Sequence, residues 1–182
     1  MFEQVKAFVK KSFEKSASGS SLEHFERTVY WLKKLKPDAD EPMLIVAYAH
    51  DIARAFRKTD AKKTFKNKEM NDPEILECHQ KQGAHILSEF LKKHDYDEKQ
   101  IKRVHNMILH HEDGGNKEAD LIKDADSISY LEINAPKHVK KLVPLIGEDK
   151  VRRKIDWMFN RISSEKAKEL AKPFYDKVLK MI

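Results

Sequence analysis

The sequence has a single cysteine, Cys78, and no long hydrophobic run. One thiol excludes a disulfide within the chain and is typical of a reducing compartment. The longest apolar run, residues 43–49, is far shorter than the roughly 20 residues that span a bilayer. Residues 1–6 do not contain the apolar core of a signal peptide. We therefore expect a soluble cytoplasmic protein that does not act in a membrane.

The chain also has no alternating strand pattern, no internal repeat and no linker-like segment. Its 182 residues are enough to enclose a sizeable core. We predict an all-α fold in which residues 1–182 form a single multi-helix domain.

The net charge is +6 and the isoelectric point is near 9.2, which favours an anionic partner. A soluble surface coated with lysine would have the same composition. A nucleic-acid binder driven by charge alone is a further hypothesis, and its affinity would fall steeply with salt. No recognition motif accompanies the charge, so we do not predict specific binding to nucleic acid.

The most informative stretch runs from Pro42 to Arg54 and is predicted to be a helix that is apolar on nearly every face. Asp40 or Glu41 would cap it, with Pro42 in its first turn. The apolar run meets His50 and Asp51, and burying these two polar groups without partners would be costly. A metal ion or a hydrogen-bond network would offset that cost.

Other helices are indicated by apolar spacing and by caps such as Ser20–Glu23 and Asp72-Pro73. The basic segment 57–72 between two helices has no periodicity and is either a solvated connector or a lid that attracts a phosphate-bearing ligand. The predicted helices cover residues 2–14, 20–36, 73–93, 95–111, 117–133, 136–146, 151–162 and 165–181, the last with a kink at Pro173.

Several histidines precede or follow the central helix. His24 lies beside an apolar row, where an isolated histidine is more commonly a satisfied core residue than a ligand. His110 and His111 are adjacent at a helix end, where both can address one site. His79 lies four residues before Gly83, a small residue that allows another backbone to approach.

The order His24, then His50-Asp51, then Asp126 resembles the motif that defines the HD superfamily of metal-dependent phosphohydrolases. The local contexts His24-Phe-Glu-Arg27, Ala47-Tyr-Ala-His50-Asp51 and Leu121-Ile-Lys-Asp-Ala-Asp126 are similar to its three motifs. The resemblance covers residues 22–131 and leaves the C-terminal helices, residues 136–182, unexplained. It implies an HD-type helical domain in which His24, His50, Asp51 and Asp126 bind a metal.

Asp124 competes with Asp126 for the last ligand position. Asp126 shares a helical row with Ile122 and Ser129 that is predicted to face inward, whereas Asp124 and Ser127 are predicted to lie on a solvated face. The family motif also places its ligand at the aspartate after alanine. We therefore select Asp126 and keep Asp124 as a residue that could orient a ligand.

The remaining histidines resemble motifs of the HD branches that bind two metals, which include the HD-GYP proteins and HD-type dinucleoside tetraphosphate hydrolases. That resemblance implies that His79, His110 and His111 bind a second ion; alternatively they form hydrogen bonds in a polar pocket. The sequence Asp113-Gly114-Gly115-Asn116 lacks the Tyr-Pro of the HD-GYP signature, so cyclic dinucleotide hydrolysis is not assigned.

These ligand types suit one or two Mn, Fe, Co, Ni or Zn ions, with Mg also possible. The prediction is a phosphohydrolase in which metal-bound hydroxide attacks the phosphorus of a small phosphate ester, with a nucleotide as the first candidate. His50, Asp51 and Arg54 form the predicted catalytic core. A mononuclear nucleotidase or pyrophosphatase, or a metal-holding regulatory module without turnover, remains open. The candidate phosphate-binding cations, each also explicable as a surface charge, are Arg27, Arg54, Arg57, Lys58 and Lys123.

Overall fold

The computed structural model describes residues 1–14, 16, 22–57, 61–65 and 67–182, and these residues contain helices but no strand. The predicted all-α fold is therefore confirmed for the described chain. The helices are α1 (Phe2–Phe13), α2 (Leu22–Leu35), α3 (Glu41–Ala49), a 3-10 helix η1 (Ile52–Phe56), α4 (Ala61–Thr64), α5 (Pro73–Lys92), α6 (Glu98–Leu109), α7 (Lys117–Ser129), a π-helical turn η2 (Tyr130–Asn134), α8 (Ala135–Ile146), α9 (Glu148–Asn160) and α10 (Glu165–Leu179).

Aspartate side chains begin three of these helices. The carboxylates of Asp40, Asp72 and Asp97 accept hydrogen bonds from backbone N–H groups in the first turns of α3, α5 and α6. Each satisfies a donor that has no partner within its own helix. The predicted box at Ser20–Glu23 begins outside the described residues.

The central helix is shorter than its apolar run suggests. α3 ends at Ala49, and the chain passes through His50 and Asp51 into η1 rather than continuing as an α-helix to Arg54. The side chains of α3 are almost all buried, so the helix lies inside the domain, as predicted. The chain changes from an α-helix to a 3-10 helix at this point. The backbone of Asp51 is therefore not α-helical, and its side chain leaves the chain in a different direction from the one it would have in a continued α-helix.

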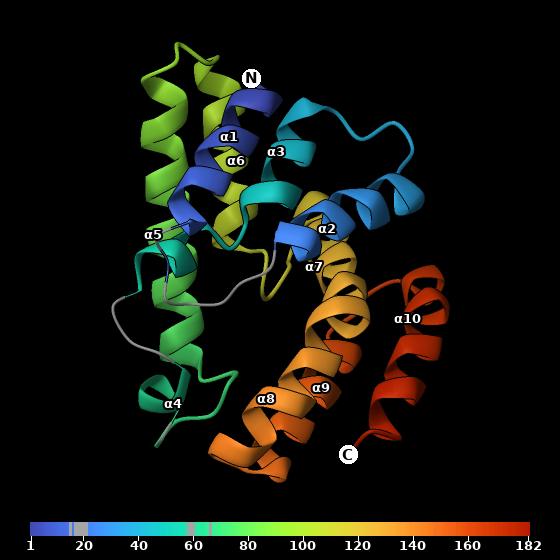
Figure 1. Ribbon diagram of the computed structural model, residues 1–182. Coiled ribbons are helices and arrows are strands. Elements are labelled where there is room, and N and C mark those ends of the chain that lie inside the picture. Colours follow the sequence, from blue (N-terminus) through green and yellow to red (C-terminus); the bar gives the residue numbers. More distant parts are fainter. Residues whose placement is uncertain (15, 17–21, 58–60, 66) are drawn as a thin grey trace.

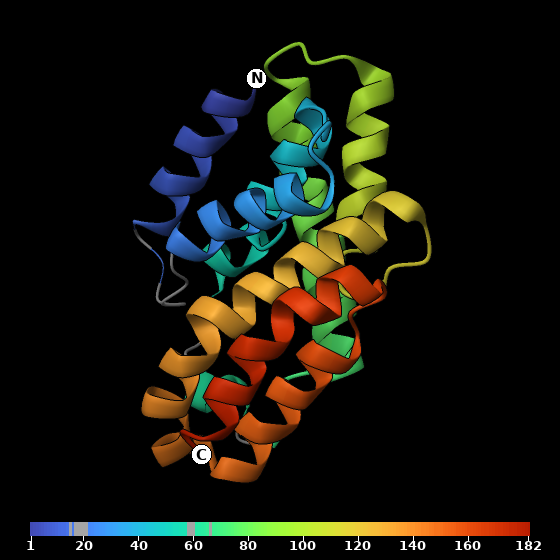
Figure 2. The same ribbon diagram turned by 90° about the vertical axis from the view of Figure 1, so that its right-hand side faces the viewer.

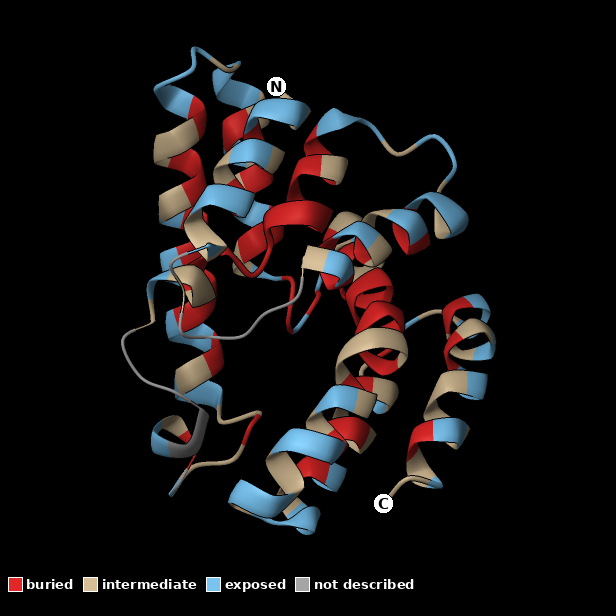
Figure 3. Ribbon diagram, in the orientation of Figure 1, coloured by how far each residue is buried: buried red, intermediate tan, exposed pale blue. Residues whose placement is uncertain are grey.

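Helices from two groups pack against α3, namely α1 and α6 from one and α2 and α7 from the other (Figure 1). α5 and α6 form an antiparallel pair on one side, and α2 lies along α7 on the other. α7, η2 and α8 follow one another as a nearly continuous rod, and α9 and α10 pack beside its lower half (Figure 2). The buried faces of both groups point inward, and the last turns of α7 are buried almost all round (Figure 3). α10 continues through Pro173 as one helix.

The face of α7 that carries Asp124 and Ser127 is buried, contrary to the prediction of a solvated face. The α9–α10 connection covers it, and the Asp124 carboxylate accepts hydrogen bonds from the backbone N–H groups of Ser163 (2.7 Å) and Ser164 (3.0 Å). It also accepts one from the Ser164 hydroxyl at 2.8 Å. Asp124 therefore fixes the start of α10 and does not orient a histidine. A sequence pattern within one helix could not show this cover.

Asp124→Ala is expected to lower the free energy of unfolding by about 1–3 kcal/mol, because it removes three hydrogen bonds between a buried carboxylate and the α9–α10 connection. Denaturant unfolding measures the change. Asp176→Ala is the matched control, since it removes only an exposed pair with Lys172 on α10 and should cost about 0.5 kcal/mol or less. Equal effects of the two substitutions would contradict the assigned role of Asp124.

Candidate metal centre

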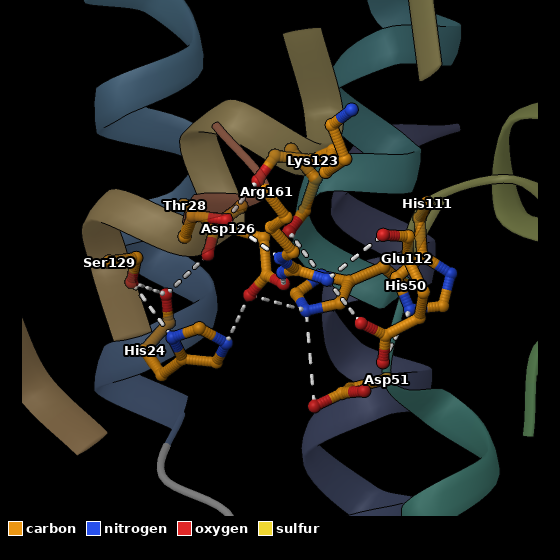
Figure 4. Close-up of polar contacts among 12 residues, drawn as sticks. His24, Thr28, His50, Asp51, His111, Glu112, Lys123, Asp126, Ser129 and Arg161 are labelled. Carbon is orange, nitrogen blue, oxygen red and sulfur yellow. Dashed lines mark hydrogen bonds and ion pairs between the residues drawn. The ribbon is translucent and has the colours of Figure 1, made fainter. Parts of the chain in front are cut away.

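Seven buried side chains from both groups of helices meet at the end of α3. Their donor atoms fall into two sets that share Asp51. The residues are His24 on α2, His50 and Asp51 after α3, His79 on α5, His111 and Glu112 after α6, and Asp126 on α7. Figure 4 shows most of them converging on one centre.

The first set contains His24, His50 and Asp51, whose donor atoms all lie within 4.8 Å of one another. Asp126 is beside them. Its Oδ1 atom lies 3.1 Å from His24 Nε2 and 3.3 Å from His50 Nε2. The order of residues predicted from the HD motif thus corresponds to one compact cluster.

The second set contains Asp51, His79, His111 and Glu112, again with donor atoms within 4.8 Å of one another. Asp51 Oδ1 lies 2.8 Å from His79 Nε2. Glu112 Oε1 lies 3.8 Å from His79 Nε2 and 3.7 Å from His111 Nε2. Asp51 is therefore placed to contribute to both sets.

Backbone and hydroxyl groups orient three of the imidazoles. His50 Nδ1 is 3.2 Å from the Ala47 carbonyl and His111 Nδ1 is 2.7 Å from the Ile108 carbonyl, and each nitrogen donates to its carbonyl. His24 Nδ1 lies 2.8 Å from the Ser129 hydroxyl, which itself donates to the His24 carbonyl. These bonds assign the proton to Nδ1 and leave the Nε2 lone pairs facing the cluster. Metal-binding histidines are commonly held in this way.

The atoms that face the cluster lack ordinary partners. Among the described residues, His50 Nε2, Asp51 Oδ1, His79 Nε2 and His111 Nε2 are buried and make no hydrogen bond of acceptable geometry, although carboxylates approach them closely. Buried polar atoms without partners are rare. Imidazole nitrogen and carboxylate oxygen are ligands for Mn, Fe, Co, Ni and Zn ions. The donor set therefore fits one or two divalent metal ions.

The pKa values of the ligands agree with this assignment. Burial lowers the pKa of His111 to about 4 and also lowers that of His79, so both are neutral at pH 7. Burial also disfavours charge on His50, but the Asp126 and Asp51 carboxylates outweigh it and raise its pKa to about 9. Asp51 is buried as well, and Arg54 and His50 nevertheless keep its pKa well below the ordinary range. A cation near the Nε2 atom of His50 would replace that proton.

Two arginines fix the carboxylates of the centre. Arg54 Nε lies 2.7 Å from Asp51 Oδ1. Arg161, at the end of α9, contacts Glu112 Oε2 through one terminal nitrogen and Asp126 Oδ2 through the other. Each of these two carboxylates thus gives one oxygen to Arg161 and directs the other toward the histidines. Arg161 also donates to the Ser127 hydroxyl at 2.8 Å and lies over the Trp157 ring.

The structure does not bring His110 to the centre. Its side chain is exposed and lines a separate surface cavity with Asp113 and Trp157. Adjacent residues at the end of α6 point in different directions, so only His111 turns inward. The ligand position predicted for His110 is instead occupied by Glu112, which is buried beside His79.

The candidate phosphate-binding cations separate into two groups. Arg54 and Arg57 line the cavity at the centre. Arg27 forms an ion pair with Glu132 at 2.8 Å, and Lys123 contacts Asp120 and points away from the cluster (Figure 4). Neither of these lines the cavity. Lys58 lies outside the described residues.

A cavity of about 200 Å³ opens from the metal centre, and the C-terminal helices form one of its walls. η2, α8 and α9 contribute side chains to that wall, so these helices, which the motif resemblance left unexplained, cover the pocket. His138, which matches no motif, is one of its lining residues, and burial lowers its pKa to about 3. The polar lining residues from this region are Tyr130, Asn134, Lys137, His138, Lys141 and Lys154.

Sequence reasoning missed three residues of the site: Glu112, Lys154 and Arg161. Glu112 had a signal, because it follows two histidines directly at a helix end. Lys154 and Arg161 lie in the part of the chain that the motif resemblance does not cover, and nothing in their local sequence separates them from surface cations.

A family model described as a domain of unknown function, DUF4202, matches residues 6–180. No curated protein matches the chain. A solved structure described as a predicted HD superfamily hydrolase from an uncultured Thermotogales bacterium is similar, with a TM-score of 0.64 and 16% identity over 98% of this chain and 87% of the other. An HD-superfamily hydrolase from Bacillus thuringiensis has a TM-score of 0.67 and 18% identity, over 98% of this chain and 91% of the other. These likenesses confirm the predicted HD fold.

The described helices include none that combines the length and the apolar character needed to cross a membrane.

Proposed function

This chain belongs to the DUF4202 family, and we propose that it is a metal-dependent phosphohydrolase that acts on a small phosphate ester, with a nucleotide as the first candidate. The observation that carries the proposal is the pair of donor sets that share Asp51. A shared carboxylate between two groups of imidazoles is typical of centres that hold two divalent ions a few ångströms apart.

The chain's own residues would hold the ions and position the substrate. His24, His50 and Asp126 would hold the first ion, and His79, His111 and Glu112 would hold the second, with Asp51 available to both. Such ions supply Lewis acidity, which lowers the pKa of water and polarises a phosphoryl oxygen.

Two cations beside the ligands complete the site. Arg54 is held by Asp51, and Lys154 is buried in the cavity wall. Both are placed to neutralise the charge that develops on phosphoryl oxygens, where fixed positive groups contribute most to the rate. The cavity wall formed by α8 and α9 excludes bulk water from that side and so strengthens these interactions.

The test measures metal content and phosphate release for the wild type, His111→Ala and His110→Ala. The adjacent histidines differ in burial, so His110→Ala is the matched control. We expect about two ions per chain in the wild type and in His110→Ala, fewer in His111→Ala, and a parallel loss of phosphate release. A wild type that releases no phosphate from nucleotides, sugar phosphates and other small esters, although loaded with metal, would contradict the proposal.

A further inference from the structure

The cavity beside the metal centre contains a buried lysine side chain without an anionic partner among the described residues. Lys154, on α9, is only 5% exposed and lines the cavity. Its Nζ atom lies 4.1 Å from the centre of the Trp157 ring and 5.8 Å from that of Tyr130. Within the described chain, Lys154 has no carboxylate at ion-pair distance. Buried lysines are rarely left unpaired, because desolvation of the charge is costly.

Arg57 and Lys141 are two further basic residues of the cavity lining. Both line it, Arg57 at the end of η1 and Lys141 on α8. Neither makes an ion pair with any described residue. Burial and the neighbouring Arg54 lower the pKa of Arg57 to about 10, as expected for a cation that lacks a sufficient counter-charge.

The charges of the cavity lining do not balance. Arg54, Arg57, Lys141 and Lys154 line it, against the three carboxylates Asp51, Glu112 and Asp126, while a further lining lysine, Lys137, pairs with Glu23. Those carboxylates are also the metal ligands and the partners of Arg161. With one or two divalent ions bound, the positive surplus grows further. A single phosphate group at the metals would leave Arg57 and Lys141 without an anionic partner among the described residues.

The cavity also has an apolar part. The side chains of Phe65, Met70, Ile75, Leu76, Leu142 and Met158 form it. Its volume, about 200 Å³, is below that of most small-molecule pockets. A nucleotide-sized ligand would therefore reach the rim, where Lys137 and Lys141 are exposed.

We propose that the cavity binds an organic diphosphate, with one phosphate at the metal centre and Lys154, the second phosphate at Arg57 and Lys141, and the organic group against the apolar lining. This rests on the proposed function for the metal centre. Arg57, directly after η1, and Lys141, on α8, would then select for a second phosphate group.

The test compares binding of two non-hydrolysable adenosine ligands to the metal-loaded protein by calorimetry: α,β-methylene ADP and the phosphonate analogue of AMP. Lys141→Met is compared with Lys140→Met, because Lys140 is the adjacent exposed lysine of α8 and does not line the cavity. We expect the diphosphate to bind the wild type at least about tenfold more tightly, as one charged hydrogen-bonded contact contributes. Lys141→Met should remove most of that difference, and Lys140→Met should not.

Equal affinities for the two ligands, or equal effects of the two substitutions, would overturn the inference whether or not the protein releases phosphate. If the protein prefers the diphosphate and loses the preference in Lys141→Met, but hydrolyses no phosphate ester, the inference stands and the proposed hydrolase activity fails. Inorganic pyrophosphate serves as the third ligand: binding as tight as that of α,β-methylene ADP would contradict the role of the apolar lining.

Discussion

Asp51→Asn is expected to abolish metal binding in both donor sets and to reduce phosphate release by about three orders of magnitude or to background. Asp51 belongs to both sets, and an amide oxygen is neutral and a weaker ligand for a divalent ion. Metal ions stabilise the charge of such a transition state by several kcal/mol, and each ~1.4 kcal/mol is a factor of ten in rate. Metal content and phosphate release, measured on the same preparation, check this expectation.

The substitution also removes the nearer of the two carboxylates that the half-buried Arg54 contacts, so a loss of folded protein must be separated from a loss of metal. Circular dichroism at the assay temperature makes that separation. Asp38→Asn is the control, because this exposed carboxylate contacts only Lys36. A folded Asp51→Asn protein with wild-type metal content would show that Asp51 does not join the two donor sets.

Arg161→Gln is expected to weaken metal binding by about 10–100-fold, the usual cost of removing a group that orients metal ligands. The guanidinium contacts one oxygen of Glu112 and one of Asp126, which belong to different donor sets, and directs the other oxygen of each toward the histidines. Loss of that contact should therefore weaken both positions. Competition with a chelating dye measures the affinities.

The visible spectrum of the Co²⁺-loaded protein distinguishes orientation of ligands from general stability. We expect Arg161→Gln to alter the spectrum, and Arg161→Lys to restore part of the affinity, since an ammonium keeps the charge but cannot contact both carboxylates with the same planar geometry. A variant with a wild-type spectrum and a lower melting temperature would assign Arg161 a purely structural role.

Much of the first donor set could be predicted from sequence, because the order of His24, His50-Asp51 and Asp126 resembles the HD motif and helical periodicity supports some of these positions. The apolar run of α3 predicts a buried helix, and His50 and Asp51 follow it directly. Asp126 lies in the row of α7 that faces inward, and the structure places it beside His24. For these residues, the helical periodicity visible in the sequence is also what turns the side chain toward the inside of the fold.

The second set was harder to predict, because its geometry depends on the backbone conformation of the turn that follows α6. The histidine pair after α6 offered two candidate ligands, and only the backbone conformation decides that His111 turns inward while His110 stays exposed. The same turn brings in Glu112, whose backbone N–H bonds to the Gln80 side chain of α5. A residue pattern along one helix does not contain that contact between two helices.

The C-terminal wall could not be predicted at all. Lys154 and Arg161 are separated from the motif residues by long stretches of chain, and their importance arises only when α9 packs against η2 and α7. The buried position of Asp124 has the same origin, since the α9–α10 connection covers its face of α7. Contacts of this kind are fixed by tertiary packing.

The most direct measurement is anomalous diffraction from crystals grown with Mn²⁺. The account predicts one peak among His24, His50, Asp51 and Asp126 and a second among Asp51, His79, His111 and Glu112, with Asp51 contacting both. A single peak in the first set would reduce the centre to one ion and leave His79 and His111 as pocket residues. Absence of both peaks from crystals of active, Mn²⁺-loaded protein would contradict the assignment of this cluster as the metal centre.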